Sequence, residues 1–146
     1  MTTFDFGDGN GAVPAHQHPN GGGWVADTAT VADTAYVGER ALVFGGAWVC
    51  GKALVSGKAR VFGKARVCDE AEVYGKARVC GAAQVYGNAR VSGRAEVSGS
   101  AWVFSKAAVY GKASVFGKAK VGDEARVFGK AAVGGEALIG LNSDHV

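Results

Sequence analysis

The sequence predicts an all-β chain whose short strands stack into a parallel solenoid, and two periodic features carry this prediction. Residues 24–143 repeat every six residues, with valine at every sixth position from Val25 to Val133. Alanine keeps a second column from Ala29 to Ala137. A short fixed period is typical of stacked repeats. A period of six also matches neither of the helical periods near 3.5 and 3.6 residues.

Within each repeat, the alternation of side chains along a strand separates an inner face from an outer face. Residues two apart in a strand share a face, so Ala59 and Val61 are predicted to point inward, and Arg60 and Phe62 outward. A glycine or aspartate and a polar residue then follow in most repeats, as in the pairs GK, DE and GN. Because glycine tolerates backbone angles that valine cannot adopt, this pair is predicted to form a corner after four extended residues.

The hexads VFGKAR, VYGKAR and VSGRAE resemble those of hexapeptide-repeat proteins, although glycine falls one place later here than in that family's usual pattern. The resemblance covers residues 24–143. It implies a single-stranded, left-handed parallel β-helix with three sides, 18 residues per coil and nearly seven coils.

The same resemblance bears on activity. Many relatives are acyltransferases, and bacterial proteins with a V-x-G-x-A repeat have been assigned as acetyltransferases by resemblance. In such enzymes a histidine between subunits acts as the general base, often beside a protruding loop. The present chain has no histidine and no loop insertion between Val25 and Asp144. We therefore expect no enzymatic activity, no catalytic residue and no cofactor.

The N-terminal segment does not repeat, so we divide the chain into a cap over residues 1–23, a solenoid over 24–143 and a tail over 144–146. Solenoids need covered ends. We expect the side chains of Phe4, Phe6 and Val13 to fold over the open end of the first coil.

His16 and His18 also lie in this segment, with His145 at the other terminus. Two histidines without a supporting carboxylate or cysteine favour a turn or surface position, so no metal site is predicted. The stretch GNGAVPAHQHPNGGGWVADTA resembles small prophage proteins, which implies a bacterial or bacteriophage source.

At the C-terminal end, four apolar side chains need cover from the last residues or from a second molecule. They are those of Val133, Ile139, Leu141 and Val146.

Stacking the repeats turns single positions into columns, and one corner column is entirely basic. This basic edge consists of Arg40, Lys58, Lys76, Arg94, Lys112 and Lys130. Arg60 and Arg78 lie beside it in an outward column. A row of like charges either keeps the protein in solution or binds phosphates or an acidic partner.

A second outward surface is aromatic, and we call Trp48, Tyr86, Trp102 and Phe104 the aromatic face. Exposed apolar patches commonly mark interfaces, so this surface predicts self-association. Stacking of bases beside arginine is the alternative interpretation. Cys50 and Cys68 fall in one column on adjacent coils, at a spacing that permits a disulfide. In a reducing compartment we expect thiols.

Net charge is distributed unevenly, with −5 over residues 1–39 and +8 over the rest of the chain. The N-terminus has no secretory signal and no apolar run is long enough to cross a bilayer, so a cytoplasmic site is expected. Together these features predict a non-catalytic, self-associating scaffold. The alternative is a protein whose basic edge captures a nucleic acid, a nucleotide or an acidic host protein, and an acyltransferase-like enzyme ranks third.

Overall fold

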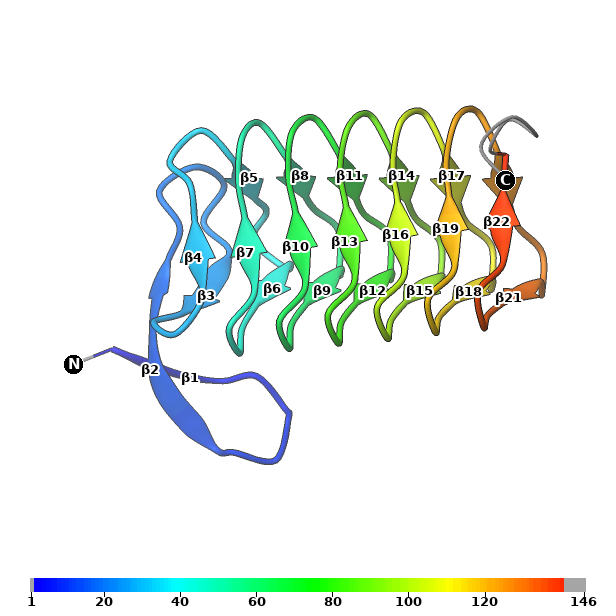
Figure 1. Ribbon diagram of the computed structural model, residues 1–146. Coiled ribbons are helices and arrows are strands. Elements are labelled where there is room, and N and C mark those ends of the chain that lie inside the picture. Colours follow the sequence, from blue (N-terminus) through cyan, green and yellow to red (C-terminus); the bar gives the residue numbers. More distant parts are fainter. Residues whose placement is uncertain (1, 141–146) are drawn as a thin grey trace.

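The structure is a computed structural model that describes residues 2–140 of the 146-residue chain. It is an all-β parallel solenoid in which three sheets surround one core (Figure 1). The predicted fold class is confirmed. The strands from β3 to β22 form six turns of three strands and two strands of a seventh turn. Within residues 2–140 no helix is long and apolar enough to cross a membrane.

Each sheet collects one strand from successive turns. The nine-strand sheet contains β1 (Thr3–Asp5), β2 (Ala12–Gln17), β3 (Trp24–Ala26), β6 (Leu42–Val43), β9 (Arg60–Val61), β12 (Arg78–Val79), β15 (Glu96–Val97), β18 (Ser114–Val115) and β21 (Ala132–Val133). The seven-strand sheet contains β4 (Thr30–Val31), β7 (Trp48–Val49), β10 (Arg66–Val67), β13 (Gln84–Val85), β16 (Trp102–Val103), β19 (Lys120–Val121) and β22 (Leu138–Ile139). The six-strand sheet contains β5 (Tyr36–Val37), β8 (Leu54–Val55), β11 (Glu72–Val73), β14 (Arg90–Val91), β17 (Ala108–Val109) and β20 (Arg126–Val127).

The register repeats every 18 residues, because Val67 pairs with Val49 on one side and with Val85 on the other. The ladder joins only two residues per side, fewer than the four extended residues predicted, because corners occupy the remaining positions. In Figure 1 the chain runs from β7 at the front over the upper corner to β8 behind and then to β9 below. It advances to the right as it does so, which makes the coil left-handed.

Valine and alanine fill the interior as predicted. From Ala35 to Val121, the side chains of both columns are 1% exposed or less. The corners depend on glycine, as Gly57 illustrates with a φ of 61°. A Cβ at Gly57 would lie 2.9 Å from the backbone nitrogen of Gly75 in the next turn. Glycine therefore supplies both the left-handed backbone and the close approach of successive turns.

The N-terminal residues form a hairpin of β1 and β2, which extends the nine-strand sheet by antiparallel pairing with β3. Phe4 stacks on Trp24 with ring centroids 4.8 Å apart, and Phe6 stacks on Phe44 at 4.9 Å. These rings form a separate apolar cluster on the outer face of the sheet. The structure thus differs from the expectation that Phe4, Phe6 and Val13 fold over the open end of the core.

The edge of the six-strand sheet is instead covered by residues 18–23. His18 is 2% exposed, and its Nε2 donates to the carbonyl of Ala35 at 2.8 Å. The backbone nitrogen of Gly23 donates to the carbonyl of Val37 at 2.9 Å. These groups supply donors that a preceding coil would otherwise provide.

The last turn is less enclosed than the first. Val133 and Ile139 are half-buried and pack against the core, while Leu138 is exposed. Leu141 and Val146, which were also predicted to need cover, lie outside the described residues, as do His145 and the predicted tail.

Candidate functional site

The basic edge lies on the corner between the six-strand and nine-strand sheets, and all six of its side chains are exposed. Lys58, Arg60, Lys76 and Arg78 line a hollow of 170 Å³ between two successive turns. The structure therefore brings the corner column and the flanking arginines together, as the sequence suggested. Nη1 of Arg78 lies 3.9 Å from Oε1 of Glu96.

An aromatic column flanks the same corner on the six-strand sheet. Tyr74 and Tyr110 are half-buried, and Phe128 is 55% exposed. Tyr110 and Phe128 stack with centroids 5.3 Å apart and planes 11° from parallel. Each ring is two residues before a basic-edge lysine, with the corner glycine between them.

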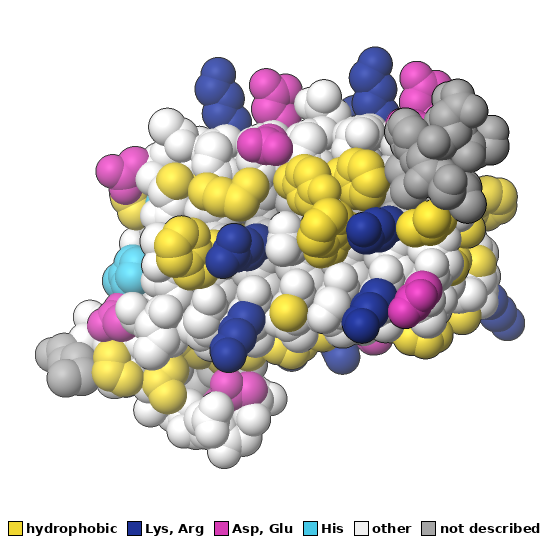
Figure 2. Space-filling model, viewed as in Figure 1, with side chains coloured by type: hydrophobic (Ala, Val, Ile, Leu, Met, Phe, Trp, Pro, Cys, Tyr) yellow, Lys and Arg dark blue, Asp and Glu magenta, His cyan; other side chains and the backbone are white. Residues whose placement is uncertain are grey.

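The aromatic face lies on the seven-strand sheet, which faces the viewer in Figure 2. Three of its four residues form one cluster. Tyr86 stacks on Phe104 at 5.4 Å and meets Trp102 edge-to-face at 6.3 Å. Trp48 lies apart, beyond Arg66 and Gln84 on the intervening strands. The structure therefore assembles Tyr86, Trp102 and Phe104 but does not join Trp48 to them.

Cations cover part of both tryptophans. The guanidinium carbon of Arg66 lies 5.6 Å from the Trp48 ring centroid, and Nζ of Lys120 lies 4.7 Å from that of Trp102. Trp48 nevertheless remains 49% exposed. Burial raises the pKa of Tyr86, and the nearby Asp69 carboxylate raises it further.

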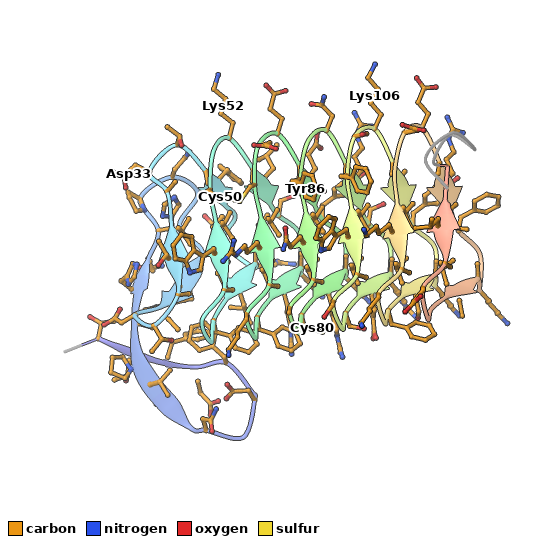
Figure 3. All side chains as sticks on the ribbon, in the orientation of Figure 1. Asp33, Cys50, Lys52, Cys80, Tyr86 and Lys106 are labelled. Carbon is orange, nitrogen blue, oxygen red and sulfur yellow. A yellow bond between two sulfur atoms is a disulfide. The ribbon has the colours of Figure 1, made fainter. Side chains whose placement is uncertain are left out.

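Cys50 and Cys68 lie next to this face and are joined by a disulfide, with their Cα atoms 4.6 Å apart. We expected thiols for a reducing compartment; the structure has the bonded pair. Cys80 has a free thiol and lies on a different side of the solenoid (Figure 3). Burial raises the pKa of Cys80, the Glu96 charge raises it further, and the Arg78 charge lowers it.

Sequence reasoning missed a hollow of 530 Å³ on the upper corner, beyond the aromatic cluster. Its lining consists of Gly87, Asn88, Ser105, Lys106, Asp123 and Glu124. Ser105 and Asp123 are two of three non-glycine residues with positive φ among those described, and the third is Asp69 on the same corner. Oδ2 of Asp69 accepts a hydrogen bond from the nitrogen of Gly87 at 3.0 Å. In the sequence, the one feature that could have indicated this hollow is that Asp69, Ser105 and Asp123 replace the corner glycine.

The two N-terminal histidines have different partners. Nδ1 of His16 lies 2.7 Å from Oδ1 of Asp27, whereas His18 bonds the Ala35 carbonyl. Among residues 2–140, no three His, Cys, Asp or Glu side chains come together in a way that would hold a metal ion.

A protein-family model described as the YdcK beta solenoid repeat matches residues 83–99. No curated protein and no solved structure matches the chain significantly. The matched segment spans β13, β14 and β15, one strand from each sheet. The match and the fold agree that the chain is built from β-solenoid repeats.

Proposed function

We propose that the chain is a non-catalytic β-solenoid scaffold whose seven-strand sheet pairs with the same sheet of a second copy. The observation that carries this proposal is the order of outward side chains on successive strands of that sheet. From β7 to β19 the order is Trp48, Arg66, Gln84, Trp102 and Lys120. A tryptophan and a cation stand on each side of Gln84.

A two-fold axis that lies between the two sheets, parallel to their strands and level with Gln84, makes this order self-complementary. The axis places Trp48 against Lys120 of the second copy, and Arg66 against Trp102 of the second copy. Each contact occurs twice, as in any isologous dimer. A cation over an aromatic ring contributes about 0.5–1 kcal/mol when exposed and about 2 kcal/mol when desolvated. The pairing therefore gains charge complementarity in addition to apolar burial.

The neighbouring column supplies the apolar part of the interface. Tyr86 and Phe104 form a flat stack beside Trp102, and Figure 2 shows hydrophobic side chains gathered at this part of the sheet. Rigid aromatic side chains are enriched at the centres of protein interfaces. This cluster lies next to the proposed axis, where water is excluded most completely.

Corner charges lie at the rim of the pair. The same axis brings Lys52 of one copy level with Glu124 of the other, and Lys106 level with Glu70. Figure 3 shows Lys52 and Lys106 extending away from the upper corner, so these charges belong to the solvent-exposed rim. Rim charges are screened by salt, and we expect moderate salt to weaken association slightly.

The non-catalytic part of the proposal rests on the histidines. The hexapeptide-repeat resemblance implies acyl transfer only where a histidine serves as base. Here His18 is buried and bonded to the backbone, and His16, beside Asp27, lies on β2 of the N-terminal hairpin, outside the repeats. The resemblance of residues 9–29 to small prophage proteins supports a bacterial or bacteriophage source.

Native mass spectrometry of the purified protein tests self-association, with light scattering after size exclusion as a second measurement. We expect twice the chain mass of 14.8 kDa and a fall to the monomer mass in Trp102→Lys, which places a cation opposite Arg66 of the second copy. Phe128→Lys is the matched control, because it places the same charge at an exposed aromatic position outside the seven-strand sheet. A monomeric parent protein, or equal dissociation in both variants, would refute the proposal.

An exchange of side chains tests the register of the pair. Trp48→Lys should dissociate the dimer, because it opposes two lysines across the axis. Adding Lys120→Trp restores a ring opposite each cation and should restore the dimer mass. A dimer that survives the single change, or a double variant that stays monomeric, would exclude an axis level with Gln84.

A further inference from the structure

The basic edge and the aromatic column beside it run parallel along the solenoid. From Lys58 to Lys130 the corner contributes one cation per turn, over four steps of about 4.8 Å or about 19 Å in total. The aromatic column contributes Tyr74, Tyr110 and Phe128 at three of the same turns. Charge and stacking surfaces thus follow one direction over a common length.

We propose that this edge binds single-stranded nucleic acid, with the cations contacting phosphates and bases stacking between Tyr74 and Tyr110. Proteins that bind single strands combine a positive groove along the backbone with aromatic platforms for successive bases. Their sites cover about 4–16 nucleotides, a range that an edge of about 19 Å fits.

Four cations make the phosphate part of the site. Lys58, Arg60, Lys76 and Arg78 surround the 170 Å³ hollow. The Arg78–Glu96 distance of 3.9 Å is long for a charge-assisted hydrogen bond, and both side chains are about half-exposed. Arg78 therefore retains donors for a phosphate. Arg94, Lys112 and Lys130 continue the positive row beyond the hollow, exposed on the same corner.

The base part of the site is a gap in the aromatic column. Ser92 occupies the turn between Tyr74 and Tyr110, so the two tyrosine positions are two turns, or about 9.6 Å, apart. Bases stack about 3.4 Å apart, and two bases between two rings require about 10 Å. The small side chain at Ser92 leaves this space open, whereas Tyr110 and Phe128 on adjacent turns already stack on each other.

Fluorescence anisotropy of a labelled oligothymidine of twelve nucleotides, titrated with the full chain over a salt series, tests the proposal. Lys76→Glu with Arg94→Glu should weaken binding at least 10-fold. The slope of log affinity against log salt should fall by about 1.4, since each lost phosphate contact removes about 0.7. Lys52→Glu with Lys106→Glu is the matched control on the corner between the seven-strand and six-strand sheets. It should change the affinity and the salt slope less than the Lys76→Glu with Arg94→Glu variant does.

Ser92→Phe separates stacking from charge. The new ring fills the gap by extending the stack that Tyr110 begins, so the fold should persist, which a thermal melt by circular dichroism checks. We expect about 10-fold weaker oligothymidine binding and an unchanged salt slope.

Four results would overturn the proposal. Three of them are an unchanged affinity in Ser92→Phe, an equal loss in the Lys52→Glu with Lys106→Glu control, and equal competition by inorganic polyphosphate at the same phosphate concentration. The last result would assign the edge to linear polyanions in general. Preferential binding of a DNA duplex of the same length would equally contradict it, because paired bases cannot enter the gap.

Discussion

The first turn of the solenoid is closed by groups from outside the repeat, whereas the last described turn is closed less completely. At the N-terminal end, His18 and Gly23 donate to carbonyls of the six-strand sheet, and β2 pairs with β3. At the other end, Val133 and Ile139 remain half-buried. Both ends carry the same valine and alanine repeat, so the difference between them lies in the groups that cover the exposed backbone edge. In a solenoid each turn contacts only its neighbours, and end cover therefore decides local stability.

The largest expected effect comes from placing a charge at equivalent positions of the two ends. Val25 on β3 is fully buried, while Val133 on β21 is half-buried. Val25→Asp should lower the free energy of unfolding by more than about 3 kcal/mol, because the carboxylate is buried without a partner. Val133→Asp should cost about 1 kcal/mol or less. Chemical denaturation of both variants measures the difference, and equal losses would show that the two ends are equally closed.

Reduction of the disulfide should have the next largest effect. Cys50 and Cys68 are 18 residues apart and link two turns in the N-terminal half. A closed loop of this length is expected to contribute about 3 kcal/mol by restricting the unfolded chain. Thermal unfolding with and without reductant tests this, with Cys50→Ser in oxidising buffer as the control. A melting temperature insensitive to reductant would mean that end cover alone holds these turns.

Replacing His18 tests the cover of the first turn directly. In His18→Ala the carbonyl of Ala35 keeps only the Nδ2 donor of Asn20, at 3.1 Å. We expect a loss of about 1–2 kcal/mol, confined to the first turns. Hydrogen exchange should show faster amide exchange at Val37 and unchanged exchange at Val85. In contrast, His16→Ala changes an exposed pair and should be close to neutral. Equal effects of the two substitutions would contradict the capping role.

The smallest effect concerns a thiol between the two ends. Burial and the Glu96 charge raise the pKa of Cys80, so at pH 8 a smaller fraction of its thiol is ionised than in an unperturbed cysteine. Because the thiolate is the nucleophile, Cys80 should react with iodoacetamide more slowly than a free cysteine does. Glu96→Gln removes a charge that raises the pKa and should speed the reaction. Arg78→Gln removes a charge that lowers it and should slow the reaction. Rates that change in the same direction in both variants would exclude this electrostatic control.

The solenoid was predictable because valine, alanine and corner glycine each return at a fixed interval, whereas its three sides and its hand were implied by the hexapeptide-repeat resemblance. The interior from Ala35 to Val121 follows directly from that pattern. The cover of the first turn was not predictable in the same way. His18 reaches Ala35 across 17 residues through a turn that has no repeat signature. Phe6 contacts Phe44 because β2 pairs with β3, and no repeat predicts that pairing.

The candidate surfaces were predictable as columns, since an 18-residue register follows from three equal sides. Their internal contacts were not, because rotamers decide them. Sequence placed Trp48 with Tyr86, Trp102 and Phe104, but in the structure Arg66 and Gln84 separate it from the other three. Ser105 likewise occupies a left-handed corner where the pattern predicted glycine or aspartate.

The register also constrains how the length of the chain can change. Inserting 18 residues between two corners adds one complete turn, and every downstream side chain stays on its original side of the prism. Inserting six residues keeps the valine interior intact but moves every downstream residue to the next side. Lys112 and Lys130 would then leave the corner that holds Lys58 and Lys76, and the straight row of cations would be broken. The core therefore accepts an insertion of any number of hexads, whereas the surface columns stay aligned only when hexads are inserted three at a time.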